Sequence, residues 1–297
     1  MKRLVFLCLS AVAAIVPALG QEARFRSSAE LVRIDVLVTD DRRPIADLAI
    51  ADFELLDNGV RQSPQLLYLE RLPVVVMMVL DSSGSVEGER LASLKGAAAI
   101  VVDRLRPVDR AAIVTFSHQL GLRAPLTSGR AALHASIAAL TADGSTSLRD
   151  AAFAGLTLAA VDRARTLMML FSDGVDTSSL LSDRQLLEIA RRSEVTVYPI
   201  GIRDAPRLTG IGRTTDGLPT DDRFLRDLAQ TTGGRLFYAE DNRELRRTFT
   251  RVIDAFNSRD VLGYAPTGVP GRGWHRVEVR LKNRKGTVVS RRGYFVN

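Results

Sequence analysis

VVVMMVLDSSGS, residues 74–85, is the stretch that decides the fold of this chain. Seven apolar residues without polar alternation are typical of a strand buried on both faces, as in the middle of a parallel sheet. The polar run that follows begins at Asp81, and ligands of open α/β sheets bind beyond the carboxyl ends of the strands. The spacing of Asp81, Ser83 and Ser85 brings three oxygens around one turn. Such hard oxygens suit Mg²⁺, Mn²⁺ or Ca²⁺ and not zinc or copper.

Two later segments offer further oxygen ligands. DGSTS, residues 143–147, carries the Thr146 hydroxyl on a glycine-containing loop before an apolar helical run. LMMLF, residues 167–171, predicts a second buried strand, and the carboxylate of Asp173 follows it. The alternative for the first segment is a strand-to-helix turn in which Asp81 and the serines bond only nearby backbone groups. The three segments together favour a metal site.

These residues resemble the metal-ion-dependent adhesion site of von Willebrand factor type A domains. The resemblance implies five metal positions, which match in type and in order: Asp81, Ser83, Ser85, Thr146 and Asp173. In that family the two carboxylates often act through water, the hydroxyls bind the metal directly, and one metal position stays open. The resemblance therefore implies a divalent cation, first of all Mg²⁺, with Mn²⁺ or Ca²⁺ as alternatives. It also implies a partner protein that offers a Glu or Asp carboxylate.

The chain from residue 73 to 259 alternates strands and helices, which predicts right-handed βαβ units. We expect a doubly wound, mostly parallel α/β sheet with helices on both faces, the Rossmann-like fold of a type A domain. Besides the two apolar strands, strands are expected at Ala111–Ser117, Val195–Ile202 and Arg235–Ala239. Helices are expected near Gly88–Leu105, Gly129–Leu140, Ser147–Asp162, Asp183–Arg192, Arg223–Thr231 and Arg243–Phe256.

The flanking segments, residues 21–72 and 260–297, are strand-like. The Asp57-Asn58-Gly59 turn predicts a hairpin between Phe53–Leu56 and Gln65–Tyr68. After residue 260, strands are expected at Val261–Tyr264, Trp274–Leu281 and Val288–Phe295. Neither segment has enough strands to bury its own apolar face, so we expect the two to pack together into one small β-sandwich.

Residues 1–20 have the pattern of a cleavable secretory signal peptide, with a basic start, an apolar run and small residues before Gln21. A retained membrane anchor is the alternative, although the run is short for one. No other stretch is apolar and long enough to span a membrane. Cys8 is the one cysteine and lies in this leader, so the mature chain has neither disulfides nor a thiol nucleophile. We therefore expect a secreted or periplasmic protein.

The charge of the chain does not indicate a nucleic-acid partner. Loss of Lys2 and Arg3 with the leader lowers the formal net charge from +7 to +5, a mild basic excess. The densest basic region, residues 272–292, alternates charges with apolar residues, as a half-buried strand with a solvated outer face does. A polyanion-binding patch is the alternative for this region. The sequence leaves the oligomeric state open.

The sequence gives little support to catalysis. The three histidines, His118, His134 and His275, are scattered, and neither a G-x-S-x-G elbow nor an H-x-x-x-H spacing occurs. We therefore predict a metal-dependent protein-binding module for adhesion or interaction that is not an enzyme. The alternatives are a structural or assembly module with a fold-stabilising metal and, less favoured, a metal-assisted hydrolase. A defined cleft with His118 close to Ser83 would favour the hydrolase, whereas an open rim would favour protein binding.

Overall fold

The computed structural model describes residues 31–41, 43–45, 47–67, 72–160, 164–172, 176–202 and 220–296. The predicted signal peptide, residues 1–20, lies outside this part of the chain, as do residues 173–175 and 203–219. Among the described residues, no helix is both long enough and apolar enough to cross a membrane.

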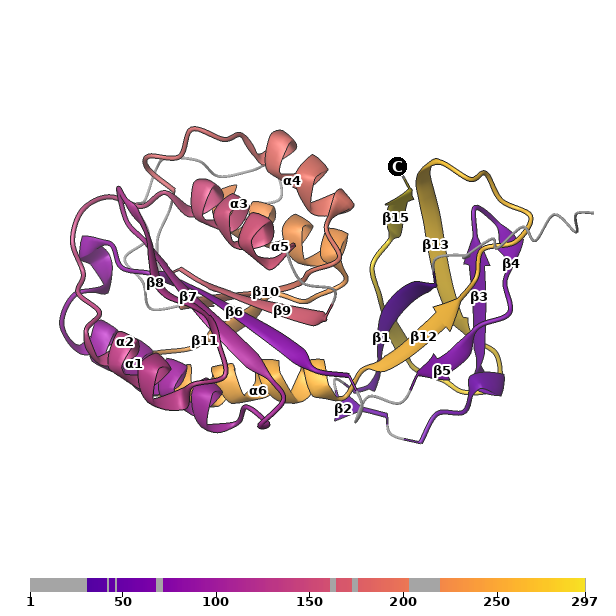
Figure 1. Cartoon of the computed structure of the whole chain (residues 1–297), viewed down its shortest axis with the longest axis horizontal. Coiled ribbons are helices and arrows are strands. Elements are labelled where there is room, and N and C mark those ends of the chain that lie inside the picture. The colour runs from indigo at the N-terminus through magenta and orange to yellow at the C-terminus, as the bar shows by residue number, and fades with distance from the viewer. Residues whose placement is uncertain are drawn as a thin grey trace, which may run out of the picture. The chain divides into compact units, whose positions relative to one another are not determined.

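A mostly parallel sheet forms the centre of the larger domain (Figure 1). Within the described residues it has six strands in the order β11-β10-β9-β6-β7-β8, and only the β7–β8 pair is antiparallel. The predicted α/β fold class is confirmed. The strands are β6 (Val74–Asp81), β7 (Arg110–Phe116), β8 (Leu120–Thr127), β9 (Arg165–Phe171), β10 (Thr196–Ile202) and β11 (Phe237–Ala239).

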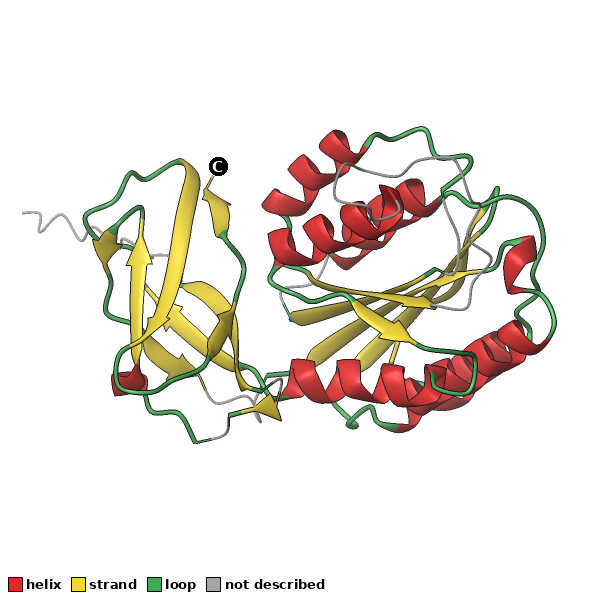
Figure 2. Cartoon of the chain, turned by 180° about the vertical axis from the view of Figure 1, so that it is seen from behind, coloured by secondary structure: helices red, strands yellow, loops and turns green. Residues whose placement is uncertain are grey.

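Helices cover both faces of this sheet (Figures 1 and 2). One face packs against α3 (Leu148–Ala159), α4 (Asp183–Arg192) and α5 (Thr220–Thr232). The other packs against α1 (Glu89–Asp103), α2 (Arg130–Ala138) and α6 (Leu245–Asn257). A capping box begins α4, because the side chains of Ser182 and Gln185 accept each other's backbone N–H groups.

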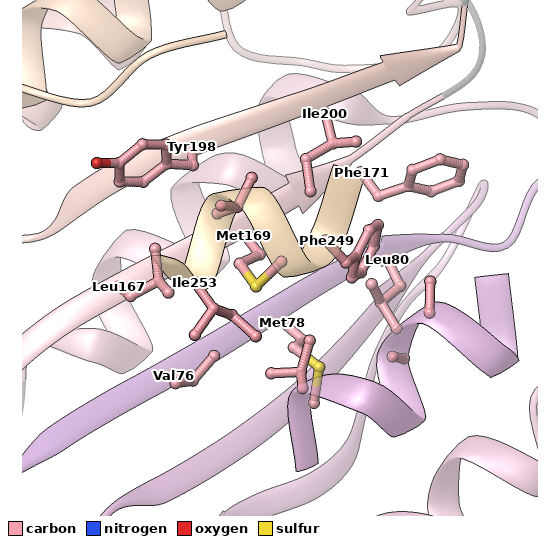
Figure 3. Close-up of a cluster of buried hydrophobic side chains, with 14 of the residues drawn as sticks. Val76, Met78, Leu80, Leu167, Met169, Phe171, Tyr198, Ile200, Phe249 and Ile253 are labelled. Carbon is pink, nitrogen blue, oxygen red and sulfur yellow. The ribbon is translucent and has the colours of Figure 1, made fainter. Parts of the chain in front are cut away.

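The apolar run of residues 74–80 forms β6, in the middle of the sheet. All eight residues of β6 are buried, and alternate side chains enter different cores. Met77 and Val79 pack under α3, whereas Met78 and Leu80 lie in the core on the other face, shown in Figure 3. Burial on both faces explains why the run lacks polar alternation.

The two flanking segments form two packed sheets, as predicted. Within the described residues, one sheet has the order β14-β1-β12-β5, with β2 on β1, and the other has the order β15-β13-β3-β4. Their shared core includes Ile34, Val36 and Leu262 from the first sheet, with Leu55 and Val277 from the second. The strands are β1 (Val32–Asp40), β2 (Arg43–Pro44), β3 (Phe53–Asp57), β4 (Val60–Arg61), β5 (Gln65–Leu67), β12 (Asp260–Tyr264), β13 (Gly273–Leu281), β14 (Thr287–Val289) and β15 (Gly293–Val296).

Two predicted strand arrangements in the β-sandwich are wrong. Asn58 and Gly59 have φ of 47° and 82°, which makes a two-residue turn, so β3 pairs with β4 immediately after it. The expected partner, β5, instead pairs with β12 in the other sheet. The single strand expected at Val288–Phe295 is two strands, since β14 pairs with β1 and β15 with β13.

Candidate metal centre

The candidate site lies at the carboxyl edge of the six-stranded sheet, where the order of the strands reverses. The chain runs from β6 outward to β7 and β8, then returns to β9 on the other side of β6. The helix that follows β6 and the helix that follows β9 lie on opposite faces. A crevice forms at such a point in open α/β sheets, and Asp81 is the last residue of β6.

Asp81 is a fully buried carboxylate held by both neighbouring loops. Its Oδ1 accepts the N–H of Ser83 at 2.9 Å, and its Oδ2 accepts the hydroxyl of Ser172 at 2.9 Å. The first bond is the local turn that Asp–x–Ser sequences favour. The second bond joins the end of β6 to the residue that follows β9, and so joins two strands on either side of the reversal.

Ser83 and Ser85 present their hydroxyls to each other. Ser83 is buried and Ser85 is exposed, and their Oγ atoms lie 3.0 Å apart. At an Mg²⁺–oxygen distance of about 2.1 Å, neighbouring ligands of an octahedron lie roughly 3.0 Å apart. The hydroxyl pair therefore matches two adjacent ligand positions of a small octahedral cation.

The loop that carries Thr146 is fastened to the loop after β6. The N–H of Gly84 donates to the carbonyl of Gly144 at 2.9 Å, and the N–H of Asp143 donates to the carbonyl of Ser82 at 2.8 Å. Thr146 itself is buried and 5% exposed. These backbone bonds bring the segment of Thr146 beside the segment of Ser83 and Ser85.

Asp173 lies outside the described residues, whereas the described residues from 177 to 181 are held by several hydrogen bonds. The N–H groups of Thr177 and Ser178 donate to the carbonyl of Thr146 at 2.9 and 3.1 Å. The carboxylate of Asp150 accepts the N–H groups of Leu180 and Leu181 at 2.9 and 3.0 Å. Asp150 therefore supports the loop after β9 directly.

Asp176 is a structural carboxylate that holds the loop after β9 to the start of α3. It accepts the Ser179 hydroxyl at 2.6 Å and the Arg149 N–H at 2.9 Å, and it pairs with the Arg149 guanidinium at 2.9 Å. Burial alone would raise the pKa of Asp176, but these hydrogen bonds and the positive charge of Arg149 hold that pKa below its usual value. Arg149 lies in the first turn of α3 and also pairs with Asp183, so one guanidinium joins α3 to the loop and to α4.

His118 lies beside the Thr146 loop, on an open rim. A Cβ atom added to Gly144 would lie 1.9 Å from His118 Nδ1, so the imidazole covers this glycine. His118, Gly84, Ser85, Asp143, Gly144 and Ser145 are all exposed. Among the described residues, the rim beside Ser83 is therefore exposed to solvent.

The donor set fits a hard divalent cation. Ser83, Ser85 and Thr146 offer neutral hydroxyl oxygens, and Asp81 offers a carboxylate. Among the described residues, no group of three or more His, Cys, Asp or Glu side chains could hold a metal. A cation held by these described residues would be bound mainly by neutral hydroxyls, with support from the Asp81 carboxylate, and would keep much of its positive charge.

Comparison with known proteins identifies the family. The model of the von Willebrand factor type A domain matches residues 76–251, more than half of the chain. The chain belongs to the von Willebrand factor type A family. The predicted domain type is therefore confirmed. Domains of this family generally mediate protein–protein interactions and commonly bind a divalent cation.

Two solved structures share this fold. The von Willebrand factor type A protein from Catenulispora acidiphila has a TM-score of 0.54 at 16% identity, covering 82% of this chain and 73% of that one. That alignment must extend beyond the type A domain into the β-sandwich strands. The vWF domain of the type V pili tip protein Mfa5 from Porphyromonas gingivalis has a TM-score of 0.52 at 16% identity, covering 63% of this chain and 95% of that one.

The curated relatives match this chain over only part of their own length. The uncharacterized protein sll0103 of Synechocystis sp. is 27% identical over 195 residues, which cover 63% of this chain and 43% of that protein. The chain spans less than half the length of the curated relatives it matches.

Proposed function

We propose that this protein is an extracellular or periplasmic interaction module that captures an acidic residue of a partner protein at a divalent cation. Asp81, Ser83, Ser85, Thr146 and Asp173 would hold the cation, with Mg²⁺ as the first candidate. The observation that carries the proposal is the Ser83–Ser85 hydroxyl pair, 3.0 Å apart, beside the buried Asp81 carboxylate.

The residues of the proposed site have different roles. A bound cation would supply an electrophilic position for an anionic oxygen. Asp81 is fixed by Ser83 and Ser172, so it cannot turn toward solvent without breaking two hydrogen bonds. The exposed Ser85 lies where the rim is open, and the neighbouring exposed loop residues leave room for a folded partner.

The extracellular placement rests on the N-terminal leader pattern and on the type V pili tip protein among the structural neighbours. The absence of catalytic activity remains part of the proposal. It is supported by the exposure of His118 and of the loop residues beside Ser83 in the part of the chain that the structure describes.

Calorimetric titration of Mg²⁺, Mn²⁺ and Ca²⁺ into the full chain tests the metal site. Ser85→Ala and Thr146→Ala each remove one hydroxyl ligand and should weaken Mg²⁺ binding by about tenfold or more, which corresponds to roughly 1.4 kcal/mol. Ser145→Ala is the matched control, since Ser145 is an exposed serine of the same loop that is not a predicted ligand. Mg²⁺ binding that is equal in all four proteins would refute the proposed ligand set.

Capture of a carboxylate needs a second experiment. An array of peptides that contain Glu or Asp is compared with the same peptides carrying Gln or Asn, with Mg²⁺ or with chelator. We expect binding that requires both the acidic residue and Mg²⁺. If Mg²⁺ raises the melting temperature but partner binding survives chelation, the metal stabilises the fold and the module is structural.

A further inference from the structure

A groove lies at the edge of the type A domain opposite to the metal centre. Its volume is about 630 Å³, within the range of pockets that hold drug-sized ligands. The last turn of α4 forms one wall, and strands β13 and β15 of the β-sandwich form the other. Because α4 begins near the metal loops and ends where the chain enters β10, the groove lies at the amino edge of the parallel sheet.

The helical wall carries two guanidinium groups. Arg191 and Arg192 follow Glu188 by three and four residues, so the three side chains share one face of α4. Glu188 lies 3.3 Å from the Arg191 guanidinium and 3.5 Å from that of Arg192. These side chains are all more than half exposed, and pairs of this kind are weak. A ligand carboxylate can therefore compete for both arginines.

The strand wall carries an aromatic pair and two more arginines. Trp274 and Phe295 are register partners on adjacent antiparallel strands, so their side chains share one face of the sheet. Arg276, two residues beyond Trp274, lies on that same face, and Arg292 lines the groove just before β15. Trp274 is 39% exposed, an unusual fraction for the largest apolar side chain.

The two walls are joined by hydrogen bonds and an aromatic contact. The Arg291 guanidinium donates to the carbonyl of Ser193 at 3.0 Å, and that of Arg292 donates to Gln230 Oε1 at 2.7 Å. The Arg192 guanidinium lies 4.2 Å from the centre of the Phe295 ring. The groove is therefore formed before any ligand arrives, which lowers the entropic cost of binding.

The lining selects a ligand by charge and shape. The lining carries four guanidinium groups and only two carboxylates, those of Glu188 and Glu278, so its net charge is positive. Glu278 already accepts a hydrogen bond from Arg280 at 2.7 Å. Guanidinium groups bind carboxylates in a bidentate fashion, and flat aromatic faces accept apolar side chains. The two carboxylates disfavour a densely sulfated polymer but can accept hydrogen bonds from peptide N–H groups.

We propose that this groove binds a short acidic peptide segment that carries an apolar or aromatic residue, independently of the metal. The acidic side chains pair with Arg191, Arg276 and Arg292, and the apolar residue packs on Trp274 and Phe295. The same molecule would then have two acid-recognising sites on opposite edges of one sheet. This site does not rest on the proposed metal function.

The test uses the one tryptophan of the chain as its probe. Trp274 is the only tryptophan, so its emission reports on this groove alone. The full chain with chelator is titrated with a blocked pentapeptide, Glu-Asp-Phe-Glu-Asp, and with its Gln/Asn analogue. We expect a saturable change in emission with the acidic peptide that weakens as salt is added, and no change with the neutral analogue.

Variants assign the effect to the groove. Arg191→Gln combined with Arg276→Gln should weaken peptide affinity by about tenfold. Arg184→Gln, an exposed arginine of the same helix outside the groove, should leave it within about twofold. An equal response to the neutral peptide, or equal losses in the two sets of variants, would overturn the proposal. Tighter binding of a heparin-derived oligosaccharide than of the peptide would overturn the assigned ligand class. Chelator in every sample keeps these outcomes separate from those of the metal site.

Discussion

Replacing Gly144 by alanine should weaken both the fold and the metal site. Gly144 has a φ of 80°, and an L-residue in the left-handed region costs about 1–2 kcal/mol. The new Cβ would lie 1.9 Å from His118 Nδ1, so the imidazole must move. Since His118 is exposed and its contact with Ser117 Oγ is long, at 3.5 Å, that movement adds at most about 1 kcal/mol. We expect the free energy of unfolding to fall by about 1–3 kcal/mol in total. Each kcal/mol corresponds to a decrease in Tm of roughly 2–4 °C.

The metal site responds because the Gly144 carbonyl accepts the N–H of Gly84, between the two serine ligands. Calorimetry should show Mg²⁺ affinity about tenfold lower in Gly144→Ala. Gly59→Ala is the control: Gly59 has a φ of 82°, with no atom within 4 Å of an added Cβ, and lies in the β3–β4 turn. It should lose about 1–2 kcal/mol of stability and keep its Mg²⁺ affinity.

A double variant separates the two costs of Gly144→Ala. His118→Ala in the Gly144→Ala background removes the ring contact and should recover up to about 1 kcal/mol, leaving only the backbone strain. If Gly144→Ala lost stability but bound Mg²⁺ as tightly as the wild type, the two loops would not be coupled and this reasoning would fail.

Three further changes have distinct expected results. Asp176→Asn should lower the free energy of unfolding by about 1–3 kcal/mol at pH 7. Because the pKa of Asp176 is lowered in the folded state, this loss of stability relative to the wild type should shrink as the pH falls below about 4. Denaturant unfolding at several pH values measures it. His275→Leu should cost about 2–4 kcal/mol in thermal unfolding, since the buried Asp57 carboxylate loses the imidazole that lies 2.9 Å away. Gly155→Ala should cost about 1–3 kcal/mol in the same assay, because its Cβ would lie 2.7 Å from Val79 Cγ2 in the core.

Each of these results has a contrary outcome. A stability difference for Asp176→Asn that stays constant from pH 7 to pH 3 would show that the carboxylate charge is irrelevant. The hydroxyls of Tyr264 and Tyr294 also donate to the Asp57 carboxylate, at 2.9 and 2.7 Å. An unfolding free energy of His275→Leu equal to that of the wild type would mean that these two hydroxyls alone satisfy Asp57. Gly96→Ala is the control for Gly155→Ala, since its Cβ would meet only the end of the Arg246 side chain, which can move aside. It should gain up to about 1 kcal/mol from helix propensity, and an equal loss in both variants would contradict the packing argument.

The parts of the fold that sequence reasoning predicted are those with strong local patterns. The β6 run is uniformly apolar, and the start of α4 carries a complete capping box. The edge strand β8 was not predicted, because LGLRAPLT contains Gly, Arg and Pro and only Ala124 of its eight residues is buried. Edge strands lack the burial that produces a clear pattern.

The partners of strands in the β-sandwich could not be derived from local sequence. Val288 and Phe295 read as one strand, but the chain crosses between two sheets at residues 290–292. Pairing depends on residues far away in the chain, and both flanking segments are similarly apolar.

The candidate site was partly predictable for the same reason. The spacing of Asp81, Ser83 and Ser85 is local, and the structure brings the Thr146 loop beside it through backbone bonds. The role of Asp150 could not be read from the sequence, since it holds the N–H groups of residues 30 and 31 positions away. The buried His275–Asp57 pair also escaped notice, because its members are separated by 218 positions and each resembles an ordinary turn or strand residue.

The type A domain is an insertion within the β-sandwich, and this imposes an order on folding. Strand β12, which follows the domain, pairs with both β1 and β5, which precede it, and β13 pairs with β3. At synthesis rates of about 5–20 residues per second, the early strands wait roughly 10–40 s for partners. The β-sandwich therefore completes its strand pairing last. By then, all strands and helices of the type A domain are already present in the growing chain.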